Sequence, residues 1–196
     1  MAITNGINIE CSDIVGAGGI RNILIRTWAD LDDVTYTNTS TLHGISSISH
    51  NSSTATWFNY EFKQELPSLT VTAARENGST SYECALSFMM PDMDNGKSAA
   101  LQQLMDTCMM VIAVGNNGKS YVLGVSEKYS NEKAKIRSQT YASMTGAEGA
   151  TGAGINDDNG WTVTLSCKQW EAPRLYTGSL TLYTNTGSGT GTSTTT

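Results

Sequence analysis

Two short segments resemble part of a phosphate-binding loop, in which glycines let backbone N–H groups approach phosphate while a lysine and a hydroxyl complete the site. Gly118-Lys119-Ser120 has Ala113 where the first glycine belongs, and it joins two expected strands. Gly96-Lys97-Ser98 lies between an expected strand and helix, but Pro91 replaces that glycine and two aspartates between them would repel phosphate. We therefore expect a turn and a helix start, and no nucleotide site.

The segment Asp157-Asp158-Asn159 could offer oxygen ligands to calcium. No glutamate follows at the spacing that a calcium-binding loop uses, and Asp-Asn-Gly is first of all a hairpin turn. We expect the turn, and calcium binding by Asp157 and Asp158 stays the alternative.

The histidines and cysteines form no recognisable catalytic or metal-binding motif. The two histidines are His43 and His50, the cysteines are far apart without a Cys-x-x-Cys pair, and no nucleophile motif accompanies them. The sequence therefore predicts no enzyme, no cofactor, and no catalytic, cofactor-binding or metal-binding residues. The cysteines are expected as reduced thiols, mostly on apolar faces; they are Cys11, Cys84, Cys108 and Cys167.

Composition indicates a mainly β protein. The 196 residues are 39% hydrophobic and only 15% charged, with 19 glycines, 3 prolines and much Ser, Thr and Asn, a mix typical of short strands joined by tight turns. The net charge of −6 disfavours ordinary nucleic-acid binding. No apolar stretch suits a membrane helix and no signal peptide is recognised, so we expect a soluble chain that stays where it is made.

Alternating apolar residues predict the strands that must form the core. The clearest is residues 82–90, where Tyr82, Cys84, Leu86, Phe88 and Met90 share one face. Residues 69–74 are expected to pair with 56–62 across Pro67. Further strands are expected at 20–28, in an exposed hairpin over 34–49, and at 109–114, 121–125, 161–167 and 175–183.

One amphipathic helix is expected, starting near Ser98. Its apolar face repeats at i, i+3, i+4 and i+7, which gives about three turns. The residues of that face are Leu101, Leu104, Met105 and Cys108.

The chain is expected to be one domain, residues 1–183, followed by a tail rich in Ser, Thr and Gly, residues 184–196. Residues 30–45 have little apolar surface, and residues 126–155 combine both charge signs with spaced glycines. We expect these two segments to be arms that neighbouring subunits order.

The order of elements resembles the tail tube proteins of long-tailed bacteriophages and of related contractile injection systems. Three segments carry the resemblance: Gly18-Gly19-Ile20-Arg21-Asn22-Ile23; the succession of strand 82–90, helix 99–108 and apolar run 109–114; and Gly152-Ala153-Gly154 followed by residues 158–165. The first segment also resembles structural proteins of phages that infect Bacteroidetes.

The resemblance implies a small β-barrel or sandwich of antiparallel strands with one flanking α-helix. Such a virion structural protein would form homo-oligomeric rings, usually hexameric, that stack into a viral tail tube. Neighbouring tail proteins would be its other partners, and genome DNA would pass through the lumen without specific binding. Assembly would take place in the bacterial host cytoplasm, with no membrane involved.

Two other functions remain open. A tail hub or adaptor ring protein could be built on the same fold. A monomeric β-sandwich that binds carbohydrate, or an adhesin module, would instead stack Trp57, Trp161 and Trp170 on sugar, although Trp161 and Trp170 are expected on opposite faces of one strand.

Overall fold

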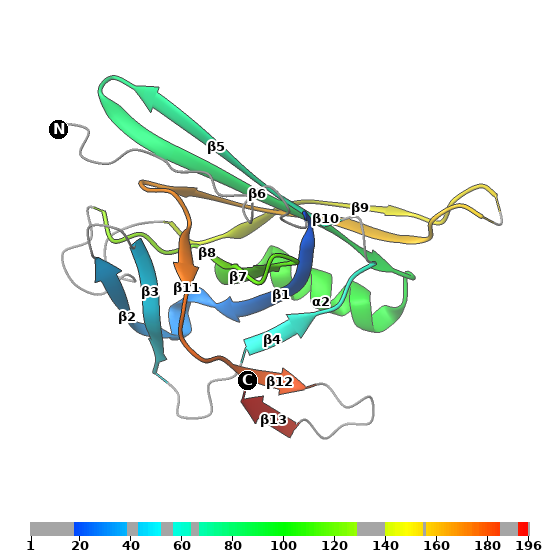
Figure 1. Cartoon of the computed structure of the whole chain (residues 1–196). Coiled ribbons are helices and arrows are strands. Elements are labelled where there is room, and N and C mark those ends of the chain that lie inside the picture. Colours follow the sequence, from blue (N-terminus) through cyan, green and yellow to red (C-terminus); the bar gives the residue numbers. More distant parts are fainter. Residues whose placement is uncertain are drawn as a thin grey trace.

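The computed structural model describes residues 18–38, 43–51, 57–63, 67–128, 140–154, 156–184 and 192–195. They form two β-sheets and one α-helix, so the expected mainly β, sandwich-like class is confirmed, while neither sheet closes into a barrel (Figure 1). The smaller sheet has the order β5 (Ser68–Glu76), β6 (Ser79–Pro91), β10 (Gly160–Gln169) and β9 (Ser143–Ala150), and every neighbouring pair is antiparallel.

The larger sheet has nine strands, in the order β13 (Thr192–Thr195), β12 (Thr181–Thr184), β4 (Trp57–Tyr60), β1 (Ile20–Thr27), β7 (Met109–Gly115), β8 (Ser120–Leu123), β11 (Arg174–Tyr176), β3 (His43–His50) and β2 (Leu31–Asn38). This sheet is mixed, because β12 pairs with β4, and β11 with β3, in parallel. The 3-10 helix η1 (Trp28–Asp30) joins β1 to β2.

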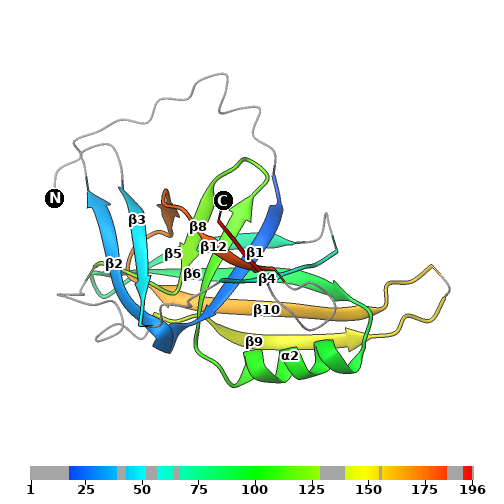
Figure 2. The ribbon, with the colours of Figure 1, turned by 90° about the horizontal axis from the view of Figure 1, so that it is seen from below.

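The strands of the two layers cross one another, and the main core lies between them (Figure 2). Alternation places the apolar residues of β6 and β10 in this core, as the sequence predicts for residues 82–90 and 161–167. A second buried cluster lies on the other face of the larger sheet, and it includes Leu24, Leu31, Val34, Ile45, Met110 and Ile112.

Helix α2 (Asn95–Met105) begins three residues before the expected start, because the Asp94 carboxylate accepts a hydrogen bond of 2.8 Å from the Lys97 backbone N–H and caps the helix. Leu101 and Leu104 are buried as predicted. The helix ends at Met105, which is 55% exposed, so Cys108 lies beyond it and is also exposed. These two residues were wrongly assigned to the apolar face.

The expected pairing of residues 56–62 with 69–74 is wrong. Strand β4 lies between β1 and β12 in the larger sheet, whereas β5 pairs with β6. The reason is local, since Asn77 and Gly78 both have positive φ and form the two-residue turn that favours a tight β5–β6 hairpin. The single strand expected at 175–183 is two strands, β11 and β12, separated at Gly178.

The two expected arms contain regular structure. Residues 31–38 are β2, and Leu31, Val34 and Ile45 are buried, so the premise of too little apolar surface in residues 30–45 is wrong. Within residues 126–155, β9 pairs with β10, while 129–139 and 155 lie outside the described residues. Within the expected tail, β13 pairs with β12. Ordering by neighbouring subunits stays a prediction.

Replacing Leu104 by alanine should lower the free energy of unfolding by about 2–5 kcal/mol, because its side chain is 3% exposed and truncation leaves a cavity in the core. Met105→Ala is the matched control on the same helix and should cost less than about 1 kcal/mol. Denaturant melts of both variants measure the difference. Equal costs would show that α2 does not pack through Leu104.

Candidate functional site

The most distinctive surface is the face of the smaller sheet that points away from the core. Its β6 and β10 residues alternate with the buried ones, so short polar side chains predominate. No described helix or strand lies over this face in Figure 1, although Met89, which points outward opposite Thr162, is buried. We call it the hydroxyl face, and it includes Ser68, Thr70, Thr72, Glu83, Ala85, Ser87, Glu148, Thr162, Thr164, Ser166 and Lys168.

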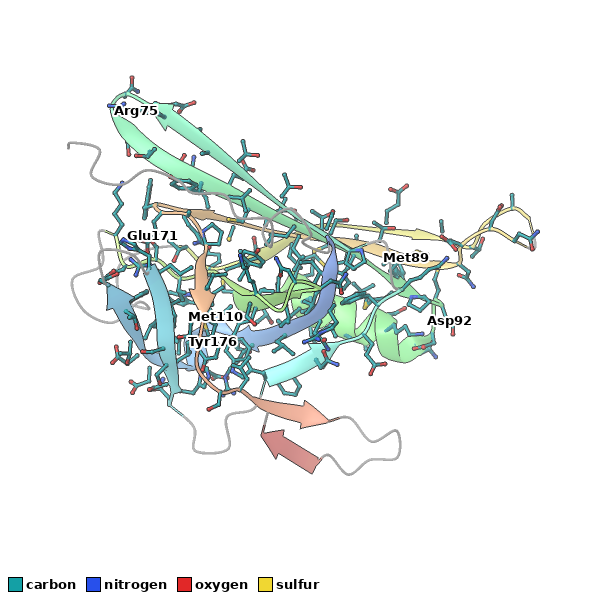
Figure 3. All side chains as sticks on the ribbon, in the orientation of Figure 1. Arg75, Met89, Asp92, Met110, Glu171 and Tyr176 are labelled. Atoms are coloured by element: carbon teal, nitrogen blue, oxygen red, sulfur yellow. The ribbon has the colours of Figure 1, made fainter. Side chains whose placement is uncertain are left out.

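Among the described strands, the same sheet has two free edges, because β5 pairs only with β6 and β9 only with β10. Of the nine residues of β5, only Leu69 is even partly buried, and the tip of the hairpin projects beyond the rest of the molecule at Arg75 (Figure 3). Natural proteins usually protect such edges with prolines, charges or a covering element. Here β9 carries one charge, Glu148, and the charges of β5 lie only at its tip.

The two segments that resemble phosphate loops are a turn and a helix start, as predicted. Gly118 occupies a turn with φ of 75°, and the Asn117 side chain accepts a hydrogen bond from the Lys119 backbone N–H. At the other segment, the Lys97 Nζ lies 3.0 Å from a carboxylate oxygen of Asp94. That ammonium group is therefore already paired with an anion of the protein itself.

The aspartates of the expected turn have partners within the protein. The Asp157 carboxylate accepts hydrogen bonds of 2.8 and 2.7 Å from the backbone N–H groups of Ala153 and Gly154, and these bonds lower its pKa. Asp158 forms an ion pair with Lys63. Across the described residues, no group of three or more His, Cys, Asp or Glu side chains is arranged to hold a metal ion.

Two of the cysteines lie opposite each other in the core. Cys84 and Cys167 face one another across β6 and β10, and both are buried free thiols, as expected. A hydrogen bond between the thiols lowers the pKa of Cys84 and, together with burial, raises that of Cys167. Cys108 is exposed, contrary to expectation, and Cys11 lies outside the described residues.

The three tryptophans considered for sugar stacking do not form an open platform. Trp57 is buried and Trp161 packs against the main core, while Trp170 is half-buried. A stacking platform needs an exposed aromatic face.

A polar cluster that the sequence did not reveal attaches the β2–β3 hairpin to the body. The Arg174 guanidinium, 7% exposed, lies 2.5 Å from Glu127 and 2.9 Å from Glu171, and it donates a 2.6 Å hydrogen bond to the Asn38 side chain. It also lies over the Tyr36 ring, at 4.9 Å from its centroid. The side chains that bond to Arg174 are 3 to 136 residues away from it in sequence, so no local motif could identify the cluster.

His50 lies at the end of the same hairpin, against the ring of Trp57. Neither imidazole nitrogen has a hydrogen-bond partner among the described residues. Burial and the positive charge of Arg26 lower the pKa of His50 to about 4, although Asp30 opposes the shift.

A pH dependence of stability follows from His50. Above pH 6.5 the imidazole is neutral in both states; between pH 6.5 and about 4 the unfolded chain binds a proton that the folded chain does not. The free energy of unfolding should therefore fall by about 1–3 kcal/mol over this range. His50→Gln should remove that component, whereas His43→Gln, at an exposed position of β3, should retain it. Identical pH profiles for the wild type and His50→Gln would contradict the assignment.

Among the described residues, no helix is long and apolar enough to cross a membrane. A scan against protein-family models gave no match, and searches of the curated proteins and of the solved structures gave no significant match either.

Proposed function

We propose that the protein is a tail tube subunit of a bacteriophage, which assembles into stacked rings around a channel for the genome. The observation that carries the proposal is the smaller sheet, which combines two free edges with an open face of short polar side chains. An edge strand exposes a row of unpaired backbone N–H and C=O groups, and another strand is their natural partner. Pairing β9 of one copy with β5 of the next satisfies both edges.

The directions of the strands suit this pairing. Because all neighbours in the sheet are antiparallel, its two edge strands run in opposite directions. Copies related by rotation about a ring axis therefore bring β9 against the next β5 in antiparallel orientation. Such a head-to-tail contact closes into a ring when the rotation divides a full turn.

The direction of the side chains limits the registers in which β9 of one copy can pair with β5 of the next. Directly opposite residues of antiparallel strands point to the same side of a sheet. Ser68 points outward with Thr164, and Ala150 points outward with Gly160. Placing Ser68 of one copy opposite Ala150 of its neighbour keeps this alternation and uses the full length of β9. Thr70 then lies opposite Glu148, with both side chains on the hydroxyl face.

This register also sets the tilt of the strands. Within one sheet Ser68 is level with Thr164 and Ala150 with Gly160, so each copy is displaced by about four residues, roughly 13 Å, along the strands. The step across four strands is about 19 Å. The resulting tilt is about 35°, at the lower end of the 35–45° typical of closed barrels.

The hydroxyl face would line the channel in such a ring. Its charged residues are Glu83 and Lys168, which lie opposite each other, Glu148, and Glu76 at the tip of the β5–β6 hairpin. A hydroxyl-rich surface without a cluster of cations gives passing DNA little to bind, because phosphate contacts dominate affinity for nucleic acid. The net charge of −6 for the whole chain is consistent with that role.

A hub or adaptor ring is the second candidate, because it would use the same two edges and the same lining. Stacking of the rings separates these roles, since a tube subunit forms long tubes and an adaptor forms single rings. The carbohydrate-binding alternative has no comparable support, given the positions of Trp57 and Trp161.

A disulfide between copies tests the edge pairing. Thr70→Cys with Glu148→Cys, in a Cys11→Ser and Cys108→Ser background, should give a ladder of covalent multimers under mild oxidation. Directly opposite residues have Cα atoms about 4.5–5.5 Å apart, within the span of a disulfide. Non-reducing electrophoresis reads the ladder.

The matched control replaces Ala74 instead of Thr70, because residue 74 also points outward from β5 but lies four residues, about 13 Å, further along the strand. It should give little cross-linking. Rings visible by electron microscopy without a ladder from the 70–148 pair would show that these edges do not meet.

A further inference from the structure

The two long sides of the sandwich, between the sheets, are unlike each other. On the β9 side, α2 closes the gap: Leu101 and Leu104 pack in the main core with Met144 of β9 and Ile25 of β1. Figure 2 shows the helix running alongside β9. This side is therefore closed within the single chain.

On the β5 side, no described element fills the gap between the sheets. A cavity of about 570 Å³ lies there beneath the start of β5, between it, the start of β1 and the β7–β8 turn. A void of this size would be exceptional in a close-packed interior. No lining residue is charged, and the apolar part of the lining includes Ile20, Pro67, Leu69, Val71, Ala172 and Pro173.

We propose that helix α2 of one copy docks over this cavity in the next copy, forming a second layer of the subunit contact. The proposal rests on the ring assembly proposed above. Pairing β9 with the neighbouring β5 places the closed side of one sandwich against the open side of the next, because α2 lies beneath β9 and the cavity beneath β5. The occupant is therefore another copy of this chain.

The exposed apolar residues agree with this contact. Only three large hydrophobic side chains are exposed among the described residues, and two of them lie on the surfaces that would meet: Val71, 41% exposed in the cavity lining, and Met105, 55% exposed on α2. Residues 99–105 of the helix carry no charge, like the cavity lining. Their burial removes apolar area from water and leaves no ion unpaired.

Charge substitutions test the contact. Met105→Glu and Val71→Glu should each raise the protein concentration needed for ring formation at least tenfold, because each would bury an unpaired carboxylate. Ser47→Glu, at an exposed position of β3 outside this contact, should assemble as the wild type does. Sedimentation velocity measures assembly, and thermal melts of the dilute variants show whether the chains are folded.

Methionine oxidation gives a second readout that does not depend on a variant. Met105 should form sulfoxide readily with dilute peroxide in the isolated chain and at least tenfold more slowly in assembled rings. Rings that form normally from both folded glutamate variants, or that leave Met105 as reactive as in the monomer, overturn this contact alone. A wild type that never assembles overturns the proposed function together with it.

Discussion

Unpaired backbone hydrogen-bonding groups along β5 and β9 are the constraint on which the proposed account depends. A strand that is paired on both sides needs no further partner. Among the described strands, β5 and β9 each leave a row of donors and acceptors at one side of the smaller sheet. The antiparallel order of four strands makes the edges complementary in direction, and their offset gives a barrel-like tilt. One pairing rule would thus define the contact, its register and the face that lines the channel.

The rest of the fold holds this sheet in position. The larger sheet crosses beneath it and supplies the opposite wall of the main core, and α2 fills the gap along β9. On the face of the larger sheet that points away from the main core, the second hydrophobic cluster and the polar cluster around Arg174 hold the β2–β3 hairpin in place. Losing Arg174 would leave the carboxylates of Glu127 and Glu171 without their shared partner. Rigid support matters because an edge must keep its shape to pair with another copy.

Local pattern was sufficient for much of the fold. Period-two alternation identified β6 and β10, and the i, i+3 spacing identified α2 through Leu101 and Leu104. The pairing of the strands was harder to predict, because it depends on long-range packing. Strand β4, for example, lies beside β1 and not beside β5. Strand β9 was missed because its glycines and a bulge near Thr145 interrupt the alternation. The free edges could not be recognised before each strand's neighbours were known.

Electron cryomicroscopy of the purified protein at high concentration tests the central claim most directly. The account predicts closed rings, stacked into tubes, in which β5 of each copy lies beside β9 of the next and the hydroxyl face lines the channel. Single chains at every concentration, or rings in which both edges stay exposed to solvent, would contradict it.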